Sequence, residues 1–157
     1  MLLFSPALAT DRAARPGLSH FVEFRARPSG DIGHSLVVYG PLDAHGRPAE
    51  RHHASFIPGM DGRKGMIFPI HGKVGASHDD IHAVAIASYR RDISAAQYER
   101  VQFAVRRMKA QQRLWHAMFL NCNDLSIEVA EAIELRRPPG WLPPNLWVEM
   151  LRALNGD

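Results

Sequence analysis

The sequence predicts an α+β protein in which an antiparallel sheet packs against about three helices. Two observations support this. Residues 18–90 hold short alternating or apolar runs separated by glycine and proline, whereas residues 94–155 repeat apolar side chains at three- and four-residue spacing. No linker separates the halves, and 157 residues is an ordinary length for one domain. We therefore expect a single domain over residues 18–157.

The first half contains four expected strands. Alternation of apolar and polar side chains, β-branched residues, and bounding glycines or prolines mark them. They are expected at residues 20–26, 35–39, 51–57 and 81–89. Further short strand pieces are expected at residues 66–68 and around Val74, inside a glycine-rich stretch.

The second half contains three expected helices. The first begins at Ser94, because Ser94 and Gln97 form an S-x-x-Q capping box. The second runs from about Cys122 to Glu134 and ends before two prolines and a glycine. The third begins near Pro144, since proline is favoured in a first helical turn.

Composition excludes several classes of protein. A single cysteine allows neither an internal disulfide nor a zinc site built on cysteine pairs. The net charge of +3 is too small to predict a nucleic-acid partner, and no apolar run is long enough for a transmembrane segment. Oligomeric state is left open. Nine histidines are an unusual number, and eight of them precede residue 83.

Residues 1–17 form either a flexible N-terminus or the remnant of a signal peptide. The triplet at residues 7–9, Ala-Leu-Ala, is of the kind that signal peptidase cleaves after, but no basic region precedes it. A signal remnant implies a periplasmic or secreted protein, and a plain terminus a cytoplasmic one.

Cys122 lies where a connecting segment enters a helix, in the run Leu-Asn-Cys-Asn-Asp-Leu. Free amide groups and the helix dipole at such a position favour the thiolate, so we expect a lowered pKa. Asn121 is a good helix cap and brings an amide donor beside the thiol. The alternative is that Cys122 is a small buried apolar residue.

A nucleophilic thiol needs a base, usually histidine. His34 is the best choice, because it begins the strand Gly-His-Ser-Leu-Val-Val-Tyr-Gly, where a rigid sheet can hold an imidazole against a helix start. The alternative is an ordinary surface histidine at a strand end.

The two motifs GHSLVVYG and FLNCNDLSIEVAEAI, taken together, resemble the circularly permuted papain-like fold. This superfamily includes the NlpC-type cell-wall peptidases, and its permuted branch, with lecithin retinol acyltransferase-like and PPPDE-like members, places the histidine strand before the cysteine helix. The resemblance spans residues 33–154. Leu125 stands where that branch commonly has an aromatic residue.

The resemblance implies a cysteine hydrolase, a peptidase or amidase, or an acyltransferase that needs no cofactor. Cys122 would attack a carbonyl carbon and form a thioester, with His34 as base. The Cys122 amide would hold the oxyanion, with Asn121 as an orienting or second donor. Cell-wall peptides, other amides and lipid esters remain open as substrates.

The family's third polar residue lies on the strand after the histidine strand, here residues 51–57. If the intervening turn pairs Asp43 with Pro48, His34 faces Ile57, and His53 and Ser55 share its face. We choose His53 as the third residue. A slip of one residue would give the role to His52.

Two other readings compete with an enzyme. Histidines at 52, 53, 71, 78 and 82 supply metal ligands in number, but their spacing matches no zinc motif, so no metal is expected. A non-catalytic binding module would keep the fold without the chemistry. Leu125 and the unclear third residue favour that module.

Overall fold

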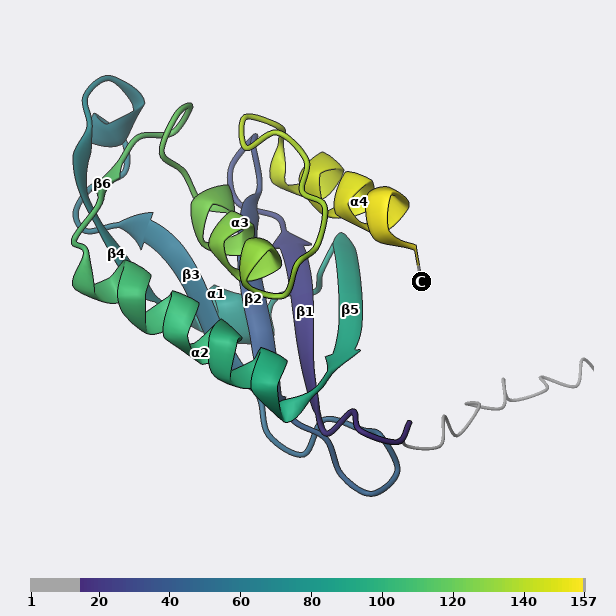
Figure 1. Ribbon diagram of the computed structural model, residues 1–157. Coiled ribbons are helices and arrows are strands. Elements are labelled where there is room, and N and C mark those ends of the chain that lie inside the picture. Colours follow the sequence, from purple (N-terminus) through teal and green to yellow (C-terminus); the bar gives the residue numbers. More distant parts are fainter. Residues whose placement is uncertain (1–14, 157) are drawn as a thin grey trace, which may run out of the picture.

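The structure, a computed structural model, describes residues 15–156. Six strands form one sheet in the order β5-β1-β2-β3-β4-β6, and all neighbouring pairs are antiparallel (Figure 1). The strands are β1 (His20–Arg27), β2 (His34–Pro41), β3 (His52–Pro58), β4 (Ile70–Gly75), β5 (Ala87–Ile93) and β6 (Leu114–Trp115). The predicted α+β class with an antiparallel sheet is confirmed.

Three longer helices cover one face of this sheet (Figure 1). They are α2 (Ala95–Ala110), α3 (Asn123–Ala132) and α4 (Pro144–Asn155). Their buried side chains, such as Met108, Leu125 and Trp147, form one core with Phe24 and Phe56 of the strands. The Ser94–Gln97 capping box is present as predicted. Burial of this apolar face supplies the main driving force for folding.

The remaining helical segments are short. A 3₁₀ turn, η1, spans Lys64–Met66, and the five-residue helix α1 spans His78–His82. In Figure 1, α1 lies behind the sheet, on the side away from α2 and α3. Within residues 15–156, no helix combines the length and apolar character needed to cross a bilayer. The Ala-Leu-Ala triplet at residues 7–9 falls outside the described residues.

Two strand predictions were wrong. Instead of a strand at residues 81–89, the chain forms α1 and then β5, because Ser77 and Asp80 make a capping box that begins a helix. Instead of a strand at residues 66–68, the chain forms η1 and an exposed turn. Alternation alone misled at both places, since Val84 and Phe68 are exposed rather than buried.

The register of β2 with β3 follows the prediction, although the turn between them does not. Val38 pairs with His53, in the register that would place His34 opposite Ile57. The turn, however, pairs Leu42 with Pro48 rather than Asp43 with Pro48. One extra residue on the β3 side absorbs the difference as a bulge. It lies opposite Gly40, where a Cβ atom would come within 2.2 Å of the Glu50 carbonyl oxygen.

Candidate functional site

Cys122 lies at the start of α3, where it occupies the N-cap position with helical backbone angles. The Asn121 side-chain oxygen accepts a hydrogen bond of 2.9 Å from the Asn123 amide, so it satisfies a free donor of the first turn. The Asn121 amide donates back to the Ala117 carbonyl at 3.4 Å. Asn121 therefore orders the turn that presents the thiol.

The thiol of Cys122 is buried, with 8% of the residue exposed. Burial raises the pKa of this thiol, and the amide and hydroxyl of Ser35, which favour the thiolate, offset only part of that rise. The expected lowering of the Cys122 pKa is therefore wrong in direction, because loss of water outweighs the helix start. The Ser35 hydroxyl is itself buried, and it has no hydrogen-bond partner of standard geometry within the described residues.

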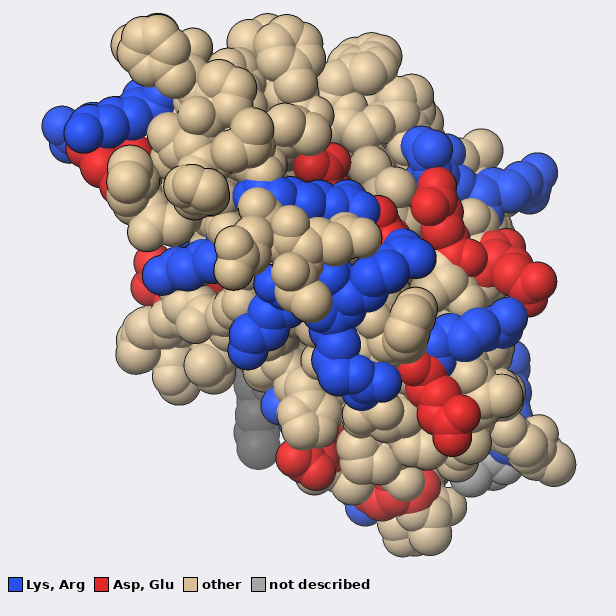
Figure 2. Space-filling model, turned by 60° about the vertical axis from the view of Figure 1, so that its left-hand side comes forward, with Lys and Arg blue, Asp and Glu red and all other residues tan. Residues whose placement is uncertain are grey.

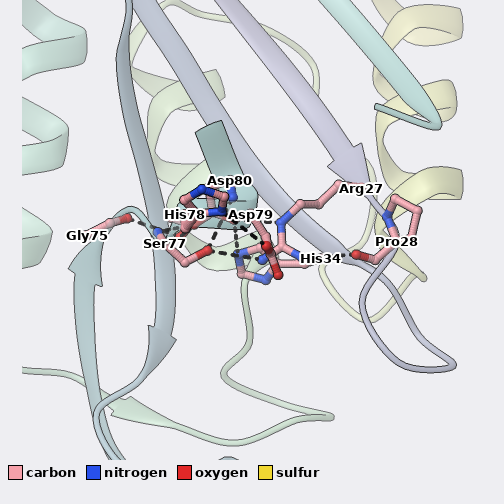
Figure 3. Close-up of polar contacts among 9 residues, drawn as sticks. Arg27, Pro28, His34, Gly75, Ser77, His78, Asp79 and Asp80 are labelled. Carbon is pink, nitrogen blue, oxygen red and sulfur yellow. Dashed lines mark hydrogen bonds and ion pairs between the residues drawn. The ribbon is translucent and has the colours of Figure 1, made fainter. Parts of the chain in front are cut away.

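His34 begins β2 and turns its imidazole toward Asp80 of α1 (Figure 3). The Nε2 atom of His34 lies 3.5 Å from Oδ1 of Asp80 and has no closer polar partner. This contact fixes which ring nitrogen faces the acid. Because Nε2 is directed at Asp80, Nδ1 is the nitrogen left for any reaction partner.

Asp80 is the centre of a buried polar cluster, which we call the Asp80 network: Asp80, Arg27, His34, Ser55 and Ser77. Oδ1 accepts a hydrogen bond of 2.7 Å from Arg27 Nε. Oδ2 accepts from the Ser55 hydroxyl at 2.9 Å and from the Ser77 amide at 2.8 Å. Burial alone would raise the pKa of Asp80, but these donors outweigh it and hold the pKa below its usual value. Asp80 is thus an ionised acid with a fixed direction.

Sequence reasoning missed Asp80, although a signal was present. Ser77 and Asp80 stand three residues apart, which is the spacing of a capping box and marks the start of a helix. A strand was instead expected to begin at residue 81, directly after Asp80. Its distance along the chain from His34 concealed the contact.

Burial also controls the protonation of His34. It lowers the pKa of the imidazole to about 4, with Asp80 opposing this change and Arg27 adding to it. Near neutral pH the site therefore holds a neutral imidazole and a neutral thiol.

Cys122 and His34 lie at the same end of the sheet but on opposite faces of β2. Alternation directs His34, with Leu36 and Val38, to the face of α1, whereas Ser35 and Val37 face α3. Both residues nevertheless line one cavity of about 890 Å³. Within residues 15–156, no hydrogen bond joins the two side chains, so the structure brings them to one cavity without direct contact.

The candidates for the third residue separate clearly. His53 pairs with Val38, which lies four residues along β2 from His34. The His53 side chain is partly buried, and this burial lowers its pKa. His52 is exposed and contacts Tyr39 and Glu50. Ser55 alone joins the Asp80 network. The structure therefore places Asp80, and not His53, beside His34.

The remaining polar groups do not form a second site. Across residues 15–156, no three His, Cys, Asp or Glu side chains are grouped as a metal site requires. Basic side chains gather over α2 (Figure 2), but Arg113 and Arg100 form ion pairs of 2.8 and 3.5 Å with Glu128 and Glu134. This is the ordinary solvated face of an amphipathic helix.

Comparison with models of known protein families, with curated proteins and with solved structures finds no match for this chain. Functional inference therefore rests on the geometry of the site.

Proposed function

We propose that this protein is a thiol-dependent hydrolase or acyltransferase in which Cys122 is the nucleophile and His34 its base. The observation that carries the proposal is that Cys122 and His34, distant in sequence, line one cavity while a buried ionised acid faces the imidazole. A thiol, a histidine and an orienting acid are the parts that nucleophilic acyl transfer requires.

In the proposed reaction, the Cys122 thiol gives its proton to Nδ1 of His34 while the sulfur bonds to a carbonyl carbon. The tetrahedral oxyanion collapses and expels an alcohol or amine, which takes the proton from His34. The remaining thioester is attacked by water or by a second acceptor, and His34 again relays the proton. The free thiol is then restored.

The described groups support separate parts of this reaction. Asp80, as a positioning residue, favours the imidazolium that forms after each proton transfer. The Cys122 amide, at the start of α3, is a donor for the oxyanion, and the Asn121 side chain orders that turn. Because the Cys122 thiol and the His34 imidazole are both neutral before the reaction, proton transfer between them accompanies attack on the carbonyl carbon rather than preceding it.

The order of the parts supports a permuted papain-like arrangement. The histidine strand β2 precedes the cysteine helix α3, and α3 packs with its start at the end of an antiparallel sheet (Figure 1). Base catalysis in this arrangement requires Nδ1 to reach the thiol around the start of β2. Catalytic contacts in ligand-free sites are often long and tighten when substrate binds.

A non-catalytic module with the same fold is the competing function. The raised pKa of Cys122 and the absence of a Cys122–His34 hydrogen bond within the described residues favour it. The two functions differ in one measurable property, which is acceleration of thiol acylation by His34.

Acylation by p-nitrophenyl acetate, followed by mass spectrometry, tests the proposal. Because Cys122 is the single cysteine of the chain, any hydroxylamine-labile thioester must lie there. We expect His34→Gln to slow acylation by about 10²–10⁴-fold, as loss of a general base does. Cys122→Ala should form no thioester.

Two matched variants complete this experiment. His71→Gln, at an exposed histidine of β4, should acylate at the parental rate. His53→Gln separates the two candidates for the third residue, since slow acylation would favour His53 over Asp80. Equal rates for the parent and His34→Gln would overturn the proposed function and favour the non-catalytic module.

A further inference from the structure

The cavity beside Cys122 is lined mostly by apolar side chains. The apolar lining includes Met66, Trp115, Met118, Phe119, Trp141 and Ile32. Its volume of about 890 Å³ lies within the range of cavities that bind small molecules. An apolar ligand of substantial size therefore fits the lining.

Charged groups in this cavity are few and already engaged or at its edge. Arg27 is buried and bonded to Asp80, whereas Asp31 and Arg63 are exposed. Deeper in the cavity than Arg63, a carboxylate of a peptide would lose water without gaining a cationic partner, which is costly. The interior is thus poorly suited to a charged peptide.

The apolar lining continues to the surface as an apolar rim, defined here as Met66, Met118, Phe119 and Trp141. These residues are 55–75% exposed. A hydrogen bond of 3.1 Å from the Ala117 amide to the Gly65 carbonyl joins the turn that holds Met66 to the one that holds Met118 and Phe119. In Figure 2 the upper part of the molecule is mostly free of charge, in contrast to its middle. Exposed apolar area of this kind marks a binding site.

We infer that the cavity and the apolar rim hold the acyl chain of an ester or thioester substrate. This inference rests on the proposed function of Cys122 and names its substrate class. The chain lies along the apolar lining while its carbonyl carbon meets the sulfur of Cys122. The carbon–sulfur bond forms, the bond to the leaving oxygen or sulfur breaks, and the leaving group takes the proton relayed by His34.

Turnover of p-nitrophenyl esters of increasing chain length tests the inference. Each buried methylene should raise kcat/KM by roughly fourfold until the cavity is filled. From acetyl to octanoyl, if the six added methylenes are all buried, we therefore expect a gain on the order of 10³-fold. An ester of similar length that ends in a carboxylate should lose this gain. Equal rates for all chains, or a preference for the charged one, would overturn the inference.

Variants of two exposed aromatic residues provide the matched comparison. Phe119→Ser should reduce the gain with chain length, and Phe103→Ser, on the exposed side of α2 and outside this cavity, should not. Phosphatidylcholine vesicles form a second arm: release of fatty acid from vesicles identifies a lipid donor, whereas turnover of dissolved esters alone identifies a soluble one.

A binding measurement separates this inference from the proposed function. Cys122→Ala protein should bind Nile red, an uncharged fluorescent apolar dye, and methyl octanoate should compete more strongly than methyl butyrate. Binding without any turnover by the parent would sustain the acyl site and overturn the hydrolase. Turnover by the parent without dependence on chain length would sustain the hydrolase and overturn the acyl site.

Discussion

Two groups of residues that line the cavity, here called its first and second walls, are built in different ways. The first is the Asp80 network, which reaches the cavity through Arg27, His34 and Ser77. It joins a helix and three strands through hydrogen bonds and ion contacts, and its Asp80 side chain is fully buried. The second is the apolar rim, which lies on turns whose side chains are largely exposed. The first wall fixes direction and charge, and the second offers adaptable apolar contact. Chemistry that needs precise geometry belongs on the first wall, and recognition of varied chains on the second.

Loss of the charge on Asp80 should have the largest effect on stability. Asp80→Asn leaves the Arg27 guanidinium buried without its counter-charge, which costs about 3–5 kcal/mol of unfolding free energy. Urea unfolding measures the loss. Asp79→Asn, at the exposed neighbour in the same helix, should change stability by less than about 0.5 kcal/mol. Similar losses for both variants would show that α1 is merely fragile.

Low pH should reduce the free energy of unfolding through protonation of His34, which belongs to the same network. Its pKa is about 4 when folded and 6.5 otherwise, so the unfolded chain takes up the proton first. This contribution is complete above pH 6.5 and is lost as pH falls toward 4, by roughly 3 kcal/mol. Urea unfolding across this window should be steeper in pH for the parent than for His34→Gln. Parallel curves would mean that His34 is not buried as described.

Removal of one neutral donor should have a smaller effect. Ser55→Ala takes a hydroxyl donor from Oδ2 of Asp80, with an expected loss of about 1–3 kcal/mol in urea unfolding. Ser126→Ala is the matched control, because the Ser126 hydroxyl is buried without a partner and should cost little. A larger loss in the control than in Ser55→Ala would contradict the network's importance.

Substitutions in the apolar rim should change the free energy of unfolding least. Phe119→Ser removes a ring that is 75% exposed, so thermal and urea unfolding should shift by less than about 0.5 kcal/mol. The same variant is expected to alter chain-length preference, which would separate recognition from stability. A loss above about 1 kcal/mol would make this wall part of the folded core instead.

Local signals in the sequence predicted much of the fold. The alternation over residues 20–26, the capping box at Ser94 and the prolines before the last helix each correspond to an observed element. The strand expected over residues 81–89 failed because alternating apolar residues there are exposed, and a helix start at Ser77 preceded them. Alternation predicts a strand only when one face becomes buried.

The site was harder to predict than the fold. Cys122 and His34 could be selected as candidates because each stands at the start of an element. The spacing of Ser77 and Asp80 marks a helix start in the sequence, but it does not show the contact of Asp80 with His34, which depends on how the chain between β4 and β5 packs behind the sheet. The direction of the Cys122 pKa was missed for a similar reason, because sequence position shows the helix start but not the depth of burial.

The capping box of α1 gives the site an unusual dependence on folding. The same Asp80 carboxylate that accepts from the Ser77 amide to begin α1 also faces His34. Local opening of this single turn therefore removes the acid from the imidazole, and also from Arg27 of β1 and Ser55 of β3. Hydrogen exchange at the Ser77 amide would report how often the protein visits this disassembled state, and ligands that depend on an ordered His34 should slow that exchange.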